Sequence, residues 1–322
     1  MTSSPTSSST EFSLILPIFN EEGNIPELYQ RSKAVLTSLG IHEILFINDS
    51  SKDRSTELLS DLAASDPCVK VIEFSRNFGH QIAISAGLDF ARGNAVIIMD
   101  SDLQDPPEAI HEMVQKWREG YEVVYGKRHT RKDTFGKKLT AFLFYRMLRR
   151  FANIHIPEDT GDFRLMDRKA ADAMRMFTEH SRFMRGLTSW VGFRQTFVLF
   201  DRDERKFGTT HYPFKKMMKL AIDGLTSFSY IPLRLATWVG FFTAGIGFLW
   251  GLYVIYRRFF LPPAETVTGW TTLVIAIFFV GGVQLIILGI MGEYIGRIYT
   301  EAQHRPLYLV SHTINIHDSN RS

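Results

Sequence analysis

The sequence predicts an α/β domain built on a parallel sheet and followed by two membrane-spanning helices. Short apolar runs alternate with helical patterns four times after the first ten residues, polar residues follow these runs, and two long stretches near the end carry no charge. Alternating strands and helices form a parallel sheet with right-handed crossovers, so the carboxyl ends of the strands share one edge. We expect the functional residues at this carboxyl edge.

Each element follows from its own local pattern. Strands are expected, in order, at Phe12–Leu16, Glu43–Asn48, Val69–Phe74, Ala95–Met99 and Glu122–Tyr125. Helices are expected between them, at Asn24–Leu39, from Ser55 to about Ala64, and in a segment that carries Ile82, Ala86 and Phe90 on one side. Later elements are an acidic turn at Asp159–Leu165 that enters a strand, a helix from about Arg168, and strands at Phe193–Phe200 and within Leu307–Ile316.

The segment Ala95–Glu108 carries the clearest sign of a site. Its first five residues are too few for a helix and read as a strand buried on both faces. Asp100 and Asp102 follow directly, and a pair of prolines then prevents the strand from continuing. A close acidic pair at this edge suits a hard divalent cation that carries phosphate oxygens, with Gln104 as a further ligand. An isolated Asp-x-Asp is more often a solvated turn, but the strand before it and the helix start after it favour the metal-phosphate site.

Polar residues after other strands point to the same edge. Asp49 and Arg76 follow the second and third strands, so they converge there with Asp100 and Asp102. Each of them alone reads as a capping or turn residue, whereas the set indicates a cleft for nucleotide phosphates. No GxGxxG follows the first strand, which disfavours a nicotinamide or flavin enzyme.

Composition narrows the class of protein. The 322 residues carry a net charge of +3 and no basic arm or stacking-aromatic motif, which gives no reason to expect a nucleic-acid partner. A single cysteine, Cys68, excludes intrachain disulfides and a thiolate zinc cluster. Residues 1–10 are rich in Ser and Thr and have no apolar h-region, so we expect a disordered tail rather than a signal peptide.

Two basic amphipathic segments, at about 136–153 and 213–229, belong to a domain that we expect to span residues 11–230. The first segment follows a loop, Gly126–Lys132, in which positive charge is concentrated. The loop alone reads as solvated, and such helices can pack on a core. Basic amphipathic helices also suit a membrane interface, where they face anionic headgroups, and we expect both segments to be interfacial.

Two uncharged stretches, at about 235–256 and 270–292 within residues 231–298, predict transmembrane helices. At ~1.5 Å per residue each crosses the ~30 Å core of a bilayer, and this apolar length outweighs the alternative of buried core helices. The flanking Lys and Arg residues place the large domain and both termini, including a tail at 299–322, in the cytoplasm. A stripe of small residues on the first stretch indicates close helix contact and a homo-oligomer. It consists of Gly240, Ala244, Gly247 and Gly251.

Six motifs, in their order along the chain, resemble the family 2 glycosyltransferases that act on polyprenyl phosphates. They read PIFNEEGNIPEL, NDSSKDRS, RNFGHQIAISAGLDFARG, MDSDLQDPPE, DTGDFRLMDR and DGLTSFSYIPLR. The resemblance covers nearly the whole chain after the tail. Members include dolichyl-phosphate mannose synthase and bactoprenol glucosyltransferase, and the two-span tail resembles the latter more. The resemblance implies a nucleotide-sugar-binding A-type (Rossmann-like) fold and an inverting transfer at a bacterial plasma membrane.

The resemblance also implies roles for individual residues. The nucleotide-sugar donor would be held by Pro17, Phe19, Glu21, Asp49 and Arg205, to which the carboxyl edge adds Arg76. Mg²⁺ or Mn²⁺ on the donor diphosphate would be held by Asp100, Asp102 and Gln104. The acceptor phosphate would meet Arg128 and Lys138, to which the basic loop adds Arg131. Asp162 would lie near the sugar and act in catalysis with Asp100 and Asp102. Departures from the usual family pattern are Ser50 for glycine, Ser101 for alanine and His211 for lysine.

The expected reaction is the transfer of glucose from UDP-glucose to undecaprenyl phosphate. A phosphomonoester with a second pKa of ~6 is largely ionised near neutral pH, so this acceptor needs cations and positioning rather than a strong general base. A GDP-mannose or UDP-aminoarabinose donor would keep the same chemistry. A processive polysaccharide synthase is disfavoured because the Gln-x-x-Arg-Trp motif is absent. An inactive nucleotide-sugar sensor or scaffold is the alternative from another class, and the retained Asp49, Asp100 and Asp102 argue against it.

Overall fold

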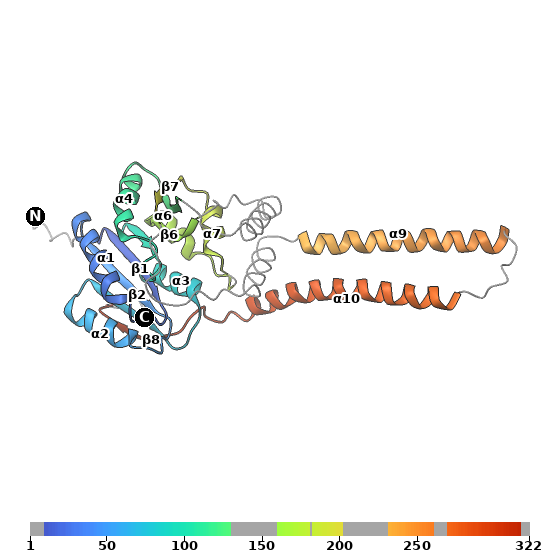
Figure 1. The fold of residues 1–322 in the computed structure, drawn as a ribbon, viewed down its shortest axis with the longest axis horizontal. Coiled ribbons are helices and arrows are strands. Elements are labelled where there is room, and N and C mark those ends of the chain that lie inside the picture. Colours follow the sequence, from blue (N-terminus) through green and yellow to red (C-terminus); the bar gives the residue numbers. More distant parts are fainter. Residues whose placement is uncertain (1–9, 130–159, 181, 202–230, 261–268, 317–322) are drawn as a thin grey trace, which may run out of the picture. The chain divides into compact units, whose positions relative to one another are not determined.

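The computed structural model describes residues 10–129, 160–180, 182–201, 231–260 and 269–316 (Figure 1). The chain divides into two compact units. One contains the α/β domain together with the segment that starts at Pro306, and the other contains the apolar region from Lys215 to Arg305. The first nine residues and the two expected interfacial helices, at 136–153 and 213–229, lie outside the described residues.

The α/β domain is built on a mixed sheet whose described strands run in the order β7-β5-β6-β4-β1-β2-β3-β8. The strands are β1 Phe12–Ile18, β2 His42–Asn48, β3 Val69–Phe74, β4 Ala95–Ile98, β5 Val123–Arg128, β6 Thr160–Asp167, β7 Gln195–Phe200 and β8 Val310–Ile314. The first four strands are parallel to one another, as the alternation of strands and helices predicts. β6 is antiparallel to both β4 and β5, and β8 is antiparallel to β3.

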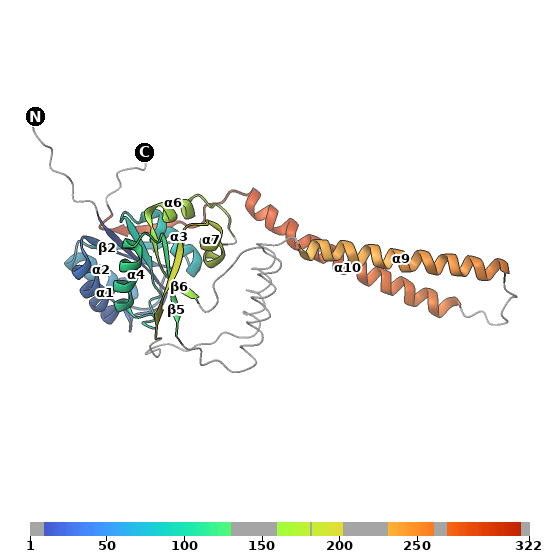
Figure 2. The ribbon, with the colours of Figure 1, turned by 90° about the horizontal axis from the view of Figure 1, so that it is seen from above.

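Helices cover both faces of this sheet. They are α1 Ile25–Leu39, α2 Ser55–Ser65, α3 His80–Phe90, α4 Ile110–Arg118 with the short η1 Pro107–Ala109 before it, α6 Arg168–Arg175 and α7 Met184–Trp190. α1, α2 and α4 lie on one face, and α3 and α6 lie on the other (Figure 2). The central strands β1 and β4 are therefore buried along their whole length, which explains why both are continuous apolar runs rather than alternating ones.

Within the α/β domain, two expected boundaries near the site are wrong. Lys127 and Arg128, which the sequence places in a basic loop, lie in β5, where they pair with Leu199 and Phe200 of β7. Asp162, which the sequence places in an acidic turn, lies in β6. Pairing with strands distant in the sequence extends both elements beyond what their local composition indicates.

A buried carboxylate ties the opposite, amino edge of the sheet together. Glu43 at the start of β2 accepts hydrogen bonds from Ser13 Oγ (2.5 Å) and the Arg92 amide (2.7 Å), and it pairs with Lys70. The Gly93 amide donates to Ser13 Oγ (2.7 Å). A Cβ at Gly93 would lie 2.6 Å from the β1 backbone, so only glycine permits this approach. Polar groups at this edge are hydrogen-bonded to one another and serve the fold.

The second unit is a helical hairpin of α9 Ile231–Phe260 and α10 Gly269–Ala302. Leu233–Tyr253 and Ala276–Ala302 have mean hydropathies of 1.5 and 1.9, and both are long and apolar enough to cross a membrane. In their most apolar windows only 6% and 0% of the residues are buried, which disfavours the alternative that these stretches are core helices. Exposed apolar surface of this extent suits association with a membrane, and the two transmembrane spans stay a prediction.

The stripe of small residues on α9 contacts α10 only in part. A Cβ at Gly240 would lie 3.8 Å from Ile287 Cδ1, whereas Cβ atoms at Gly247 and Gly251 would have no described neighbour within 4 Å. Homo-oligomerisation through this stripe stays a prediction.

Candidate active site

The carboxyl edge of the sheet brings together two acidic residues that lie far apart in the sequence. In the antiparallel pairing of β4 with β6, Ile98 lies opposite Arg164. Continuing this register by two residues places Asp100 across from Asp162. The acidic segment after β4 is therefore completed by a residue of β6, and not only by its own neighbours in the chain.

His80, the first residue of α3, lies between these two carboxylates. Its Nε2 is 3.4 Å from Asp100 Oδ1 and 3.3 Å from Asp162 Oδ2. One ligand atom from each residue lies within 4.8 Å of the other two, so this cluster can hold a metal ion. We refer to the three residues as the His80–Asp100–Asp162 cluster.

Asp162 is the most heavily hydrogen-bonded member of the cluster. Its side chain is only 7% exposed, and Oδ2 accepts from Gln81 Nε2 (3.1 Å) in addition to facing His80. Oδ1 accepts from Arg185 Nε (3.1 Å) and lies 3.4 Å from Arg164 Nη2. Burial would raise the pKa of Asp162, but Arg185, His80 and Arg164 together hold it well below its usual value. A carboxylate with these partners orients cations and is a poor proton acceptor.

Arg164 supports this arrangement from within the core. Its side chain is 1% exposed, and it donates from Nε to the Asp162 carbonyl oxygen (3.1 Å) and from Nη1 to Thr188 Oγ1 (2.6 Å). Burial lowers the pKa of the guanidinium, and the neighbouring Asp162 charge opposes that change. Because Thr188 belongs to α7, Arg164 fixes α7 against β6 and so places Arg185 beside Asp162.

The charges of the cluster alter the pKa of each of its members. Burial raises the pKa of Asp100, and the charges of Asp162 and Asp102 add to that effect while His80 opposes it. For His80, burial lowers the pKa, but the hydrogen bond to Asp162 and the charge of Asp100 outweigh burial and raise it to about 9. His80 therefore carries a positive charge near neutral pH between the two carboxylates.

The cluster fits a divalent cation. Asp100 Oδ1 is shielded from solvent and accepts no hydrogen bond from the part of the chain that the structure describes. Carboxylate oxygens suit both Mg²⁺ and Mn²⁺, and the His80 imidazole can join them as a ligand only once it has lost its proton.

Only Asp100 is common to this cluster and to the predicted metal ligands. Asp102 lies close enough for its charge to raise the pKa of Asp100, and its Oδ1 accepts the Gln104 amide (3.1 Å). Leu103, which lies between Asp102 and Gln104, is buried and has φ +58°, a left-handed conformation that is rare for a leucine. Asp102 and Gln104 stay predicted ligands.

The predicted donor residue Asp49 holds the turn that precedes α3. It is buried, with Oδ1 accepting the Phe78 amide (2.6 Å) and Oδ2 the Gly79 amide (2.9 Å). Burial raises the pKa of Asp49, and these two amides oppose the rise. The Arg76 guanidinium lies over the Phe78 ring, 4.1 Å from its centroid. Asp49 therefore binds the loop of residues 75–79, which contains Arg76 and ends directly before His80.

The other predicted donor residues follow β1. Pro17 is buried within the strand, Phe19 is 44% exposed, and Glu21 Oε2 accepts from Asn24 Nδ2 (2.5 Å). The loop after β1 is hydrogen-bonded to the loop after β2, since the Asn20 amide donates to Ser51 Oγ (3.0 Å). The two loops form one side of the carboxyl edge.

Of the predicted acceptor residues, Arg128 is described. It is half-buried at the end of β5, and a Cβ on Gly161 would lie 3.4 Å from its Nη2. Its guanidinium therefore lies beside the residue that precedes Asp162. Arg131, Lys138 and Arg205 lie outside the described residues.

Four residues of the site escaped the sequence reasoning: His80, Gln81, Arg164 and Arg185. His80 and Gln81 stand in the motif RNFGHQIAISAGLDFARG and directly follow an expected strand end. This position after a strand end is the one signal in the sequence that could have identified His80 and Gln81 as candidates. Arg164 and Arg185 have no local pattern that distinguishes them from other arginines, because their roles depend on the pairing of β6 with β4 and on the packing of α7.

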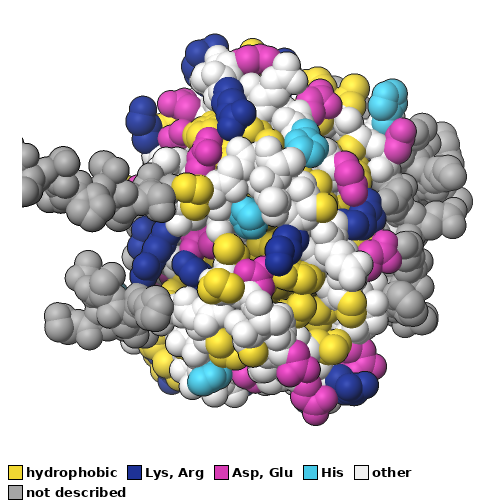
Figure 3. All heavy atoms as spheres, turned by 90° about the vertical axis from the view of Figure 1, so that its left-hand side faces the viewer, with side chains coloured by type: hydrophobic (Ala, Val, Ile, Leu, Met, Phe, Trp, Pro, Cys, Tyr) yellow, Lys and Arg dark blue, Asp and Glu magenta, His cyan; other side chains and the backbone are white. Residues whose placement is uncertain are grey.

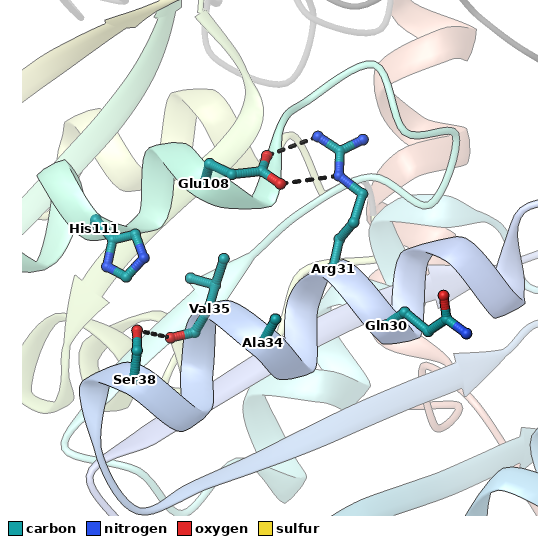
Figure 4. Close-up of a pocket in the computed structure, with 7 residues that line it drawn as sticks. All are labelled: Gln30, Arg31, Ala34, Val35, Ser38, Glu108 and His111. Atoms are coloured by element: carbon teal, nitrogen blue, oxygen red, sulfur yellow. Dashed lines mark hydrogen bonds and ion pairs between the residues drawn. The ribbon is translucent and has the colours of Figure 1, made fainter.

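A surface groove between α1 and the η1–α4 segment is separate from these residues (Figure 4). Its lining residues are Gln30, Arg31, Ala34, Val35, Ser38, Glu108 and His111. Arg31 spans it with two bonds to Glu108, Nε to Oε1 at 3.0 Å and Nη2 to Oε2 at 2.7 Å. The face in Figure 3 carries acidic and basic side chains in an interspersed pattern, as on a solvated surface.

Comparison with known proteins agrees with this geometry. Residues 13–175 match the model of glycosyl transferase family 2, and residues 231–298 match that of the GtrB C-terminal hairpin. The chain is 54% identical to the uncharacterized glycosyltransferase YkcC of Bacillus subtilis, over 95% of each chain. It is 43% identical to the bactoprenol glucosyl transferase of Shigella phage SfV, over 93% of this chain and 98% of that protein.

Among solved structures, glucosyl-3-phosphoglycerate synthase from Mycobacterium tuberculosis is similar, with 17% identity and a TM-score of 0.46 over 67% of this chain and 76% of that one. The family match and the high identity along nearly the whole chain decide the assignment. The chain belongs to glycosyltransferase family 2, with an A-type fold and a C-terminal hairpin of the GtrB type.

Proposed function

We propose that this enzyme transfers glucose from UDP-glucose to undecaprenyl phosphate at the cytoplasmic face of the bacterial plasma membrane, with inversion at the sugar. The observation that carries the proposal is the similarity to bactoprenol glucosyl transferases over 93% of the chain, which includes both the α/β domain and the apolar hairpin. The α/β domain suits the water-soluble donor, and the apolar hairpin suits an enzyme whose acceptor is a lipid.

The His80–Asp100–Asp162 cluster suits the diphosphate of the donor. A divalent cation, Mg²⁺ or Mn²⁺, held there by Asp100 with Asp102, would neutralise the charge that develops on the leaving diphosphate. Arg185 and His80 add positive charge on the protein side, since Asp162 holds both of them. Donors fixed before the reaction stabilise developing charge without reorganisation.

The acceptor phosphate would act as the nucleophile without a strong base. An oxygen of the ionised lipid phosphate forms a bond to the anomeric carbon as the bond from that carbon to the nucleoside diphosphate breaks. The low pKa of Asp162 supports this view, because such a carboxylate is a poor proton acceptor. Arg128, which lies beside Gly161, would bind the acceptor phosphate together with Arg131 and Lys138.

Two alternatives change one part of the proposal. A GDP-mannose or UDP-aminoarabinose donor would leave the cation, the acceptor and the roles of His80 and Arg185 unchanged. An inactive membrane-anchored nucleotide-sugar sensor or scaffold would bind a donor and transfer nothing. The first alternative changes only the donor specificity of the enzyme, whereas in the second the protein is not an enzyme.

One experiment separates these possibilities. The full chain, purified in detergent, is incubated with undecaprenyl phosphate, Mg²⁺ or Mn²⁺, and one radiolabelled donor at a time. We expect lipid-extractable label with UDP-glucose and none when EDTA replaces the metal. If lipid-extractable label appears only with another donor, the transferred sugar is not glucose and the donor in the proposal must change. Donor binding without lipid label from any donor would reject the transferase proposal in favour of the sensor.

A further inference from the structure

The segment that follows α10 in the chain adds the last strand to the α/β domain. Val310–Ile314 pairs with β3, and the Ser75 amide donates to the Leu309 carbonyl oxygen (3.0 Å). Past the strand, Asn315 Nδ2 donates to two backbone carbonyl oxygens, at 2.7 and 2.9 Å. Residues 306–316, which we term the C-terminal segment, are therefore held along their length by the domain.

Tyr308 connects this segment to β3 and α3. Its ring stacks on Phe74, with centroids 5.1 Å apart and an interplanar angle of 22°. Its hydroxyl donates to Asp89 Oδ2 of α3 (2.9 Å). Phe74 in turn meets Phe78 edge to face, with centroids 5.5 Å apart at 87°. Tyr308, Phe74 and Phe78 form a continuous aromatic row that runs from the C-terminal segment to the loop before α3.

The end of this row is part of the site. The amides of Phe78 and Gly79 both bind the carboxylate of Asp49, and the next residue is His80 of the cluster. Gly79 has φ +99°, a conformation that glycine adopts readily and other residues rarely adopt, so the turn depends on glycine at this position. A shift of the Phe78 ring would move the two amides away from Asp49, and with them the start of α3.

We propose that Tyr308 is a positioning residue for the donor side of the active site. Acting through Phe74 and Phe78, it holds the loop of residues 75–79 in the conformation that Asp49 binds. This conformation directs His80 toward Asp100 and Asp162. The segment that leaves the membrane hairpin thereby helps to shape the site, a role beyond anchoring. The assignment to the donor side rests on the proposed function.

The test compares Tyr308→Ala with Tyr308→Phe in the full chain. Phe keeps the stacked ring and loses only the hydroxyl bond to Asp89, whereas Ala ends the row. Loss of one aromatic pair corresponds to about 2- to 13-fold in an equilibrium. For Tyr308→Ala we expect the KM for UDP-glucose to rise by about that factor, with an unchanged acceptor KM and nearly unchanged kcat at saturating donor. Tyr308→Phe should behave like the wild type.

Hydrogen exchange of the Phe78 and Gly79 amides is the readout that needs no activity. We expect faster exchange of both amides in Tyr308→Ala and wild-type exchange in Tyr308→Phe. Asn315→Ala is the matched control, because it removes hydrogen bonds from the same segment without touching the row. If Tyr308→Ala does not fold, Tyr308→Leu keeps the bulk and removes the ring.

The outcomes separate the two proposals. Exchange and donor KM in Tyr308→Ala that match those of Asn315→Ala would overturn the positioning role. Faster exchange of the two amides in a protein that transfers no sugar in any variant would support the positioning role and count against the proposed function instead.

Discussion

Replacing Asp162 with Asn tests whether this carboxylate orients cations or accepts a proton. In the wild type its two oxygens face Arg185, Arg164, Gln81 and His80. Asn keeps the size of the side chain and one oxygen, but it removes the charge and turns an amide N–H₂ toward two donors. The contacts to the cations should weaken while the backbone of β6 stays in place.

The magnitude follows from the contacts that are lost. A hydrogen bond to a charged group contributes about 1.5–3 kcal/mol, so two such bonds at the lower value amount to about 3 kcal/mol. If both orient groups that stabilise the transition state, kcat falls by about 10²-fold. The fold also loses stability, because Arg164 is 1% exposed and loses its counter-charge. Breaking a buried pair in this way costs about 3–5 kcal/mol.

The assay measures kcat and both KM values across pH, together with thermal unfolding, for the wild type, Asp162→Asn and the control Asp172→Asn. Asp172 forms only exposed ion pairs, and its substitution should change neither activity nor stability. The pKa of Asp162 is depressed, so its charge persists until pH falls through that low value. Wild type and variant should therefore show parallel acid limbs, whereas His80 of the variant, which loses the partner that raises its pKa, should lose its proton at a lower pH than in the wild type. A wild-type acid limb that disappears in the variant, or unchanged kcat, would refute the orienting role.

Three further predictions address the metal, the acceptor and the fold. Asp100→Ala and Asp102→Ala should each abolish transfer by loss of the cation, and full activity of either variant in the radiolabel assay would reject that residue as a ligand. Arg128→Ala should raise the KM for the lipid acceptor far more than that for the donor, and equal acceptor dependence in variant and wild type would contradict the assignment. Ser50→Gly should raise the free energy of unfolding by about 0.5–1 kcal/mol, because Ser50 has φ +59° and glycine adopts this conformation without strain. A lower melting temperature would contradict this prediction.

The order and type of most elements could be predicted from local patterns. The strands β1 to β4 and the helices α1 and α2 lie within about two residues of their expected bounds, and α3 contains the three residues expected on one side of a helix, because apolar period and turn residues are local properties. The two long apolar helices also lie where the sequence expects them, but α9 extends four residues beyond the expected bounds at each end and α10 runs ten residues past Gly292. Ser50 has a left-handed backbone, and this explains why a glycine is usual at this position in the family that the sequence resembles.

The predicted positions of the site residues agree with the structure where they depended on a strand end and are incomplete where they depended on strand pairing, and the roles of these residues stay predictions. Asp49 and Asp100 lie at the carboxyl edge as expected, because parallel strands end on one side. Asp49, however, binds the amides of Phe78 and Gly79, a contact that no local pattern encodes.

Local patterns are enough to predict the α/β alternation, the carboxyl edge with its acidic pair, and a hairpin long and apolar enough for a membrane. The antiparallel pairing of β6 with β4, which brings Asp162 opposite Asp100 with His80 between them, is seen in the folded chain alone. The propensity of a segment depends on its own residues, whereas strand order depends on packing between segments that lie more than sixty residues apart in the chain.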